Sequence, residues 1–256
     1  MPIPGFCSVL VAIVSIAASA LQVAAPAESA QSGGSVVCEK FGSVPVTGGR
    51  YVVQNDLWGA DDPQCVRAFD TGFTVTVGNH RNTAQPAGYP SIFTGCHYGA
   101  CTAGTLLPRA VRDLGPVASS WSYTVPPTGS FTAAYDIWFD PTPRRDGGVT
   151  GTELMIWLRT TGPAPIGRKV ARTAVAGTEW DVWRGANGAQ VISYVRTQPT
   201  DRVDGLDLSA FLRDATARGV LPAEWYLTSV QAGFEPWTGG AGLTTNAFSV
   251  TGVASP

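Results

Sequence analysis

Two glutamates far apart in the chain stand among aromatic residues, in runs whose composition is typical of sheet strands. Glu153 begins the run Glu-Leu-Met-Ile-Trp-Leu, and Glu235 lies within Gly-Phe-Glu-Pro-Trp. A carboxylate in an apolar strand is costly because burial removes its water, so its presence suggests a functional need. Two carboxyl groups facing each other across one cleft are what cleavage of a glycosidic bond requires. This reaction is therefore the first hypothesis that the sequence raises.

Alternation along a strand places both glutamates on faces that also carry large aromatic groups. In the first run Glu153, Met155 and Trp157 share one face, and the residues between them form an aliphatic stripe that suits a core. In the second run Glu235 shares its face with Trp237. Each glutamate is thus predicted to point away from the core, beside tryptophan.

A third strand repeats this pattern, with Asp136, Trp138 and Asp140 on one face. An ordinary solvated sheet face also carries polar residues, and for one strand alone that is the simpler interpretation. Large apolar groups beside carboxylates on three strands are instead typical of a binding surface. In glycoside hydrolysis one carboxylate attacks or activates water, and the other, held protonated, donates to the leaving oxygen. Asp136 would then adjust the pKa of one glutamate.

The first 30 residues have the features of a secretory signal peptide. Val9–Ala18 is an apolar run followed by small residues, with small-x-small motifs that place the cleavage between residues 20 and 30. The run is shorter than a membrane span, and no later segment has 18 uncharged apolar residues. We therefore expect a secreted, extracellular protein with no membrane partner, in which residues 31–256 form a single catalytic domain and act as a monomer.

Four cysteines remain after removal of the signal peptide, which contains Cys7. An even number in a secreted chain predicts two disulfides, and three pairings are possible. The short spacing of Cys96 and Cys101 favours a local bridge, which leaves Cys38 to pair with Cys65. A structural zinc site is the alternative, but neither pair has a matching histidine pattern. We expect no metal and no cofactor.

The charge balance argues against a polyanionic partner. Residues 31–256 contain all 17 Lys and Arg and all but one of the 19 Asp and Glu. Such a near-neutral domain does not suit nucleic acid or an anionic membrane surface, whereas it suits a neutral ligand. The chain has 8 Trp, 7 Tyr and 10 Phe, most of which we expect in the core and a few as platforms for sugar rings.

Strand-like runs separated by turn residues recur throughout residues 31–256, which predicts an all-β fold of two antiparallel sheets in a sandwich or jelly roll. One helix is also predicted, and its apolar residues should pack against the back of a sheet. They recur with helical spacing at Leu208, Phe211, Leu212 and Ala215. Gly219 is the expected stop, and Asp204 or Asp207 the expected N-cap.

Both glutamate segments resemble the catalytic segments of glycoside hydrolase family 12, above all those of secreted actinobacterial endoglucanases. The similarity covers nearly all of residues 31–256, and further family-like segments occur in the family order at 51–55, 58–59, 63–66, 95–98, 135–138 and 239–243. It implies a jelly roll with a concave cleft that hydrolyses internal β-1,4 bonds of soluble or amorphous β-glucan with retention. A xyloglucan-specific endoglucanase, a xylanase on a related jelly roll and a lectin-like carbohydrate-binding sandwich are the alternatives.

The resemblance also implies a role for each candidate residue. Glu153 is the expected nucleophile, Glu235 the general acid/base, and Asp136 an auxiliary carboxylate. The expected substrate-binding residues are Asn55, Trp58, Trp138, Met155 and Trp157. Asp56 and Leu57 stand where the family more often has a polar or basic pair, so the outer subsite should differ. We further expect a raised pKa for Glu235 but not for Glu153, and about 5–5.5 Å between the two carboxyl groups.

Overall fold

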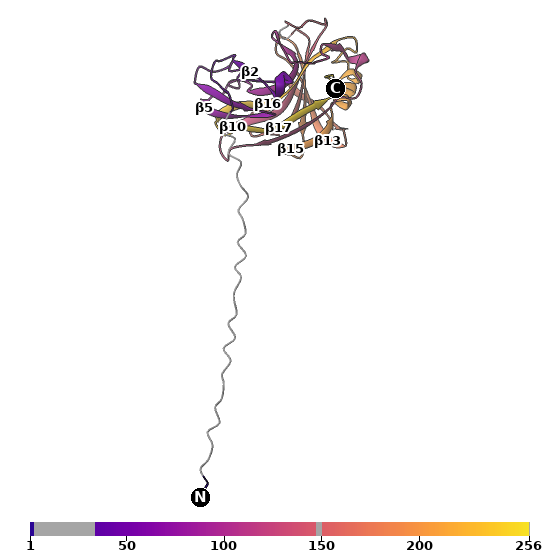
Figure 1. Cartoon of the computed structure of the whole chain (residues 1–256). Coiled ribbons are helices and arrows are strands. Elements are labelled where there is room, and N and C mark those ends of the chain that lie inside the picture. The colour runs from indigo at the N-terminus through magenta and orange to yellow at the C-terminus, as the bar shows by residue number, and fades with distance from the viewer. Residues whose placement is uncertain (3–33, 147–149, 256) are drawn as a thin grey trace. The chain divides into compact units, whose positions relative to one another are not determined.

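Two β-sheets dominate this computed structural model, which describes residues 1–2, 34–146 and 150–255 (Figure 1). Residues 32–256 form one compact unit. The predicted signal peptide, residues 1–30, lies outside the described residues except for its first two. All elements named below belong to the compact unit.

The first sheet has the strand order β1–β4–β5–β17–β9–β15. Its strands are β1 (Val36–Val37), β4 (Gln64–Phe69), β5 (Gly72–Arg81), β17 (Thr244–Thr251), β9 (Ala118–Thr124) and β15 (Arg202–Asp207). The end of β5 also pairs with β16 of the second sheet, so this strand links the two sheets.

The second sheet has the order β2–β3–β6–β16–β10–β11–β14–β13–β12 and carries the cleft described below. Its strands are β2 (Ser43–Val46), β3 (Tyr51–Gln54), β6 (Ser91–His97), β16 (Tyr226–Gly240), β10 (Ser130–Asp140), β11 (Thr152–Thr160), β14 (Gln190–Arg196), β13 (Thr178–Ala186) and β12 (Arg168–Val175). Short elements complete the fold: β7 (Ala100–Cys101), β8 (Arg109–Ala110), η1 (Thr47–Gly49) and η2 (Val111–Asp113).

The predicted all-β jelly roll is confirmed, with one difference in strand direction. Among the described strands, β11 and β14 pair in parallel, whereas the prediction had antiparallel sheets throughout. The reason lies in the connection: β12, β13 and β14 form a meander, and its last strand returns beside β11 in the same direction.

The hydrophobic core lies against the face of the second sheet that carries the aliphatic residues, as strand alternation predicted. Leu154, Ile156 and Leu158 of β11 are fully buried there. Tyr135 of β10 and Phe234 of β16 both pack against the ring of Trp121 from the first sheet, with ring centroids 5.3 and 5.8 Å away. Burial of these apolar side chains supplies the main stabilisation of the sandwich.

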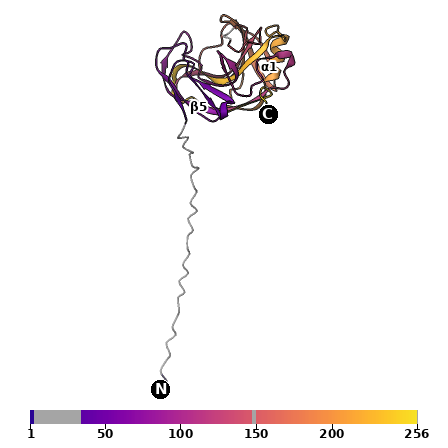
Figure 2. The same ribbon diagram turned by 45° about the horizontal axis from the view of Figure 1, so that its top comes forward.

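Helix α1 (Leu208–Ala217) covers the back of the second sheet, as predicted (Figure 2). Asp207 is its N-cap and accepts a hydrogen bond from the backbone N–H of Ala210 at 3.2 Å. Phe211 packs edge-to-face against Trp180 and Tyr194, each with centroids 5.1 Å apart. The helix therefore buttresses β13 and β14 from the side opposite the cleft.

Both predicted disulfides are formed. Cys38–Cys65 ties the segment after β1 to β4, and Cys96–Cys101 closes the β6–β7 hairpin. Within the described part of the chain, no helix is long and apolar enough to span a membrane.

Candidate active site

Strand register brings the three predicted carboxylates to one face of the second sheet. Strand β10 lies between β11 and β16. Trp138 of β10 pairs with Glu153 of β11, and Asp136 pairs with Gln231 of β16, while Glu235 follows further along β16. The alternating polar faces of three separate sequence segments thus become one continuous surface.

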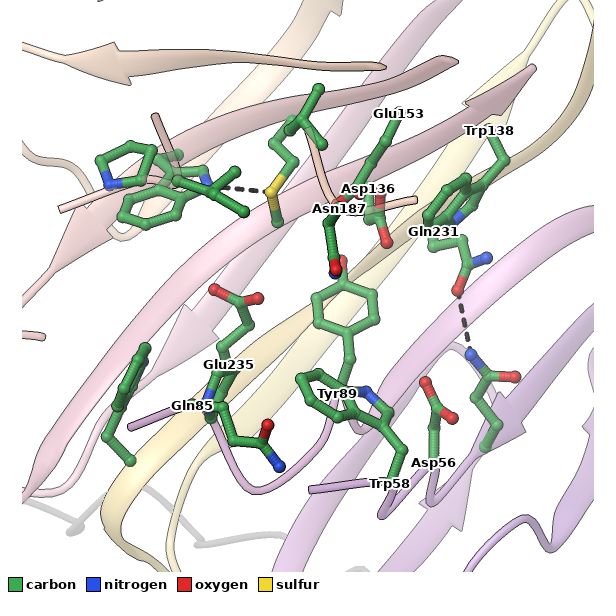
Figure 3. Close-up of a pocket in the computed structure, with 18 of the residues that line it drawn as sticks. Asp56, Trp58, Gln85, Tyr89, Asp136, Trp138, Glu153, Asn187, Gln231 and Glu235 are labelled. Carbon is green, nitrogen blue, oxygen red and sulfur yellow. Dashed lines mark hydrogen bonds between the residues drawn. The ribbon is translucent and has the colours of Figure 1, made fainter. Parts of the chain in front are cut away.

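This surface forms part of a cleft of about 1190 Å³. Glu153, Asp136 and Glu235 project into the same hollow from adjacent strands (Figure 3). Four of the five expected substrate-binding residues also line it, namely Trp58, Trp138, Met155 and Trp157. Two of these interact, since the indole N–H of Trp157 donates to the sulfur of Met155 at 3.4 Å.

Asn55 does not line the cleft, which corrects its prediction as a substrate-binding residue. Its side chain is fully buried, and its amide nitrogen donates to the backbone oxygens of Glu39 and Gln64, at 3.0 Å each. The amide of Gln64 in turn donates to the backbone and side-chain oxygens of Asn55. The chain turns after β3, so the next residue, Asp56, reaches the cleft instead.

The two glutamates share an apolar and electrostatically repulsive environment. Both residues keep partial exposure through the open cleft. Burial of the carboxyl group, followed by the negative charge of Glu235, raises the pKa of Glu153 to about 8. Burial raises the pKa of Glu235 to about 7. The expectation that only the pKa of Glu235 would be raised is therefore wrong, because both carboxyl groups lose water and the charge of Glu235 also opposes ionisation of Glu153.

Asp136 is the most deeply buried of the three carboxyl groups. Burial, then the charges of Glu153 and Glu235, raise its pKa well above the usual range. Its Oδ1 atom has no hydrogen-bond partner among the described residues, nor do the indole nitrogens of Trp138 and Trp237. Trp138 nevertheless lies close enough to Asp136 to lower its pKa, so the indole N–H of Trp237 is the group best placed to bond a polar ligand such as a sugar.

The comparison with protein families decides the class of this cleft. The model of glycosyl hydrolase family 12 matches residues 49–252. The chain belongs to this family. The lectin-like alternative is thereby excluded, and the protein is a glycoside hydrolase.

Relatives of this family 12 hydrolase include enzymes named for two kinds of glucan. The probable cellulase Cel12b of Mycobacterium tuberculosis is 38% identical over 148 residues, which are 57% of this chain and 97% of that protein. A probable xyloglucan-specific endo-β-1,4-glucanase A of Aspergillus terreus is 33% identical over 84% of this chain and 86% of its own length. The solved structure of endoglucanase Cel12A from Rhodothermus marinus is 46% identical and superposes with a TM-score of 0.82, covering 85% of this chain and 98% of that one.

Several residues that line the family 12 cleft were not predicted from the sequence. Tyr89 is buried in its floor, and its hydroxyl donates to the backbone oxygen of Ala134 at 2.8 Å. His97 also lines the cleft, and its ring centroid lies 6.3 Å from that of Trp138. Burial lowers the pKa of His97 to about 4, so the ring is neutral. These residues come from segments without strand alternation, and only the fold brings them to the cleft.

A polar network supports the cleft floor beside Asp136. The amide of Gln54 donates to Gln231 and to Ser91, both at 3.0 Å, and Gln231 donates to Ser229 at 3.2 Å. Gln231 and Ser229 alternate along β16 with the core residues and so share the face of Glu235, whereas Gln54 comes from the end of β3. The described residues contain no group of three His, Cys, Asp or Glu that could hold a metal ion.

Proposed function

We propose that this family 12 hydrolase is an endo-β-1,4-glucanase that cleaves internal bonds of soluble or amorphous β-glucan with retention of configuration. The observation that carries the proposal is the presence of Glu153 and Glu235 in one cleft, close enough for the charge of Glu235 to raise the pKa of Glu153. An open cleft lined by tryptophans suits a neutral polysaccharide that enters along its length.

In the first step, an oxygen of Glu153 attacks the anomeric carbon while the bond to the leaving oxygen breaks. Glu235 gives its proton to that oxygen, so the departing chain leaves as a neutral alcohol. The products are a covalent glycosyl ester on Glu153 and an ionised Glu235. In the second step Glu235 takes a proton from water, the water oxygen attacks the anomeric carbon, and Glu153 is released as a carboxylate.

Because both pKa values are raised, the two glutamates together hold one proton at a pH between these values. Hydrolysis requires one carboxylate and one carboxylic acid, so it falls when the pair carries two protons or none. Because both glutamates have raised pKa values, these values do not by themselves assign the two roles. The assignment of Glu153 as the nucleophile follows the family resemblance. We expect the alkaline limb of kcat/KM at about pH 7–8, from the values of the two groups.

Asp136 is proposed as a positioning residue for the nucleophile. Burial and then the charges of both glutamates raise its pKa well above the usual range, which favours the protonated form. A neutral carboxylic acid beside Glu153 adds no repulsion and can donate a hydrogen bond to the carboxylate that attacks. Trp58, Trp138 and Trp157 are proposed to stack on or flank the glucosyl units.

A covalent label tests the nucleophile directly. A 2-deoxy-2-fluoro cellobiosyl donor with a good leaving group should leave a glycosyl ester on Glu153, because the fluorine slows its hydrolysis. Peptide mass spectrometry should locate the adduct. Glu153→Gln should lose at least about 10⁴-fold in kcat while keeping the melting temperature, since the amide is not a nucleophile. Label on another residue, or near-normal turnover by Glu153→Gln, would overturn the assignment.

A side-by-side substrate panel tests the activity. Hydroxyethylcellulose, barley β-glucan, xyloglucan and xylan are compared by reducing-sugar release. Xyloglucan is the second candidate substrate, because relatives such as the Aspergillus terreus protein are named for it. A preference for xyloglucan would replace the proposed activity on unbranched β-glucan. A preference for xylan would contradict both glucanase proposals. Glu153→Gln is the negative control for contaminating enzymes.

We also propose that the protein is secreted and acts as a monomer on its polysaccharide. Two disulfides and the apolar segment near the start of the chain support an oxidising, extracellular location. Detection of the protein in culture medium, with its N-terminus between residues 20 and 31, would test the first proposal. Light scattering would test the second.

A further inference from the structure

Asp56 occupies a strained backbone position at the edge of the cleft. Its φ of 41° lies in the left-handed region, which a residue with a side chain adopts at a cost. Hydrogen bonds fix the turn: the N–H of Tyr89 donates to the carbonyl of Asp56 at 2.9 Å, and the N–H of Leu57 donates to the backbone carbonyl of Lys40 at 2.7 Å. Because both flanking side chains are buried, the turn directs only the side chain of Asp56 into the cleft.

The carboxyl group of Asp56 faces aromatic residues of the cleft, and no described residue that lines the cleft carries a positive charge. It lies beside Trp58 and Tyr89 in the close-up (Figure 3). Among the described residues that line the cleft there is no Lys or Arg, and the nearby Lys40 pairs instead with Asp61 at 2.7 Å. Burial raises the pKa of Asp56 to about 7. Above that pH the cleft gains a negative charge that no lining residue neutralises.

Asp56 acts away from the bond that is cleaved. It follows β3, whereas the catalytic glutamates lie on β11 and β16. Its charge raises the pKa of Asp136 less than the charges of Glu153 and Glu235 do, as expected for a more distant group. The other titratable groups of the cleft are Tyr89, His97 and Tyr98, and none of them is a cation at neutral pH. A substrate carboxylate bound near Asp56 would therefore meet repulsion without compensation.

We propose that Asp56 is a specificity-determining residue that makes the cleft favour neutral glucans over glucans that carry carboxylate groups. Its oxygens accept hydrogen bonds from the hydroxyls of an uncharged glucosyl unit beside Trp58. A carboxymethyl or uronate group at the same place brings a second negative charge into a partly desolvated site. The inference rests on the proposed glucanase function, because it concerns the substrate of the same cleft.

The experiment compares two derivatives of one polymer. Hydroxyethylcellulose is neutral and carboxymethylcellulose is anionic, and kcat/KM is measured on both at pH 8 and low ionic strength. Asp56→Asn removes the charge at nearly constant shape. It should raise the ratio of anionic to neutral kcat/KM about three- to tenfold, the effect of one repulsive contact in a hydrated cleft. The wild-type ratio should also rise with added salt, and the variant should show less of this rise.

Two control variants separate charge from shape. Asp56→Glu keeps the charge and should keep the wild-type ratio, whereas Asp204→Asn removes an exposed charge from β15 and should change nothing. Asp56→Ser replaces Asp56→Asn if the latter does not fold. An unchanged ratio in Asp56→Asn or Asp56→Ser, or a wild-type ratio insensitive to salt, overturns the inference. If wild type cleaves neither polymer while Glu153 also takes no covalent label, the proposed function itself has failed.

Discussion

The two faces of strands β10, β11 and β16 are both buried, but for opposite purposes. The core face carries side chains such as Leu154 and Ile156, which have no polar group to satisfy. The cleft face carries three carboxyl groups with raised pKa values and buried polar atoms without partners among the described residues. Burial therefore stabilises the fold on one face, whereas on the other it destabilises the free enzyme until a substrate supplies the missing hydrogen bonds.

Neighbouring residues on β11 give the sharpest test of this contrast. Ile156 points into the core and Met155 into the cleft. Ile156→Ala should lower the free energy of unfolding by about 2–5 kcal/mol and leave kcat/KM of the folded protein nearly unchanged. Met155→Ala should cost less stability, because one side of Met155 faces open space, and should raise KM. Urea unfolding measures the free energies of unfolding, and kinetics on hydroxyethylcellulose measure kcat and KM. Equal stability losses in the two variants would contradict the contrast between the core face and the cleft face.

Asp136→Asn should separate stability from activity on the cleft face. The pKa of Asp136 is raised on folding, so its stabilising contribution is complete below the unfolded value of 3.8 and is lost as pH rises toward and through the folded value. The uncharged amide does not suffer this loss. At pH 8 the variant should gain about 1–3 kcal/mol of stability and lose tenfold or more in kcat.

Thermal unfolding at pH 4 and pH 8 measures how the stability change caused by Asp136→Asn depends on pH. The gain should be large at pH 8 and nearly absent at pH 4, where Asp136 is protonated in the folded state and about half protonated in the unfolded state. A gain that is equal at both pH values would show that packing, not ionisation, is responsible. Asp204→Asn, which changes an exposed carboxyl of the first sheet, is the matched control.

Trp58→Ala should give the smallest effect, because this residue lies at the open edge of the cleft. Its side chain is 44% exposed, whereas Trp157 is 4% exposed. Loss of one stacking surface should raise KM for long glucans about three- to tenfold with kcat and stability little changed. Trp157→Ala, which removes a buried ring, should also lower stability. A fall in kcat without a change in KM for Trp58→Ala would contradict a role in binding.

Much of the cleft followed from local sequence patterns. Alternation on three strands assigned Glu153, Asp136 and Trp138 to faces separate from the aliphatic residues, and the structure keeps this division. The role that the family resemblance implied for Asn55 failed where the backbone leaves the strand. Asp56 adopts a positive φ after β3, which exchanges the expected roles of Asn55 and its neighbour. Distant segments hold this turn in place, so only the tertiary structure shows which of the two side chains reaches the cleft.

The sequence by itself determined the strand faces, the helix and the family, because each of these depends on residue types in local patterns. It favoured one of three possible cysteine pairings, which the structure confirms. Tertiary structure alone decided that β11 and β14 run in parallel and that Tyr89 and His97 reach the cleft. It also decided that both glutamates have raised pKa values. Desolvation and charge repulsion depend on what surrounds a group in space, and segments more than 80 positions apart supply those surroundings here.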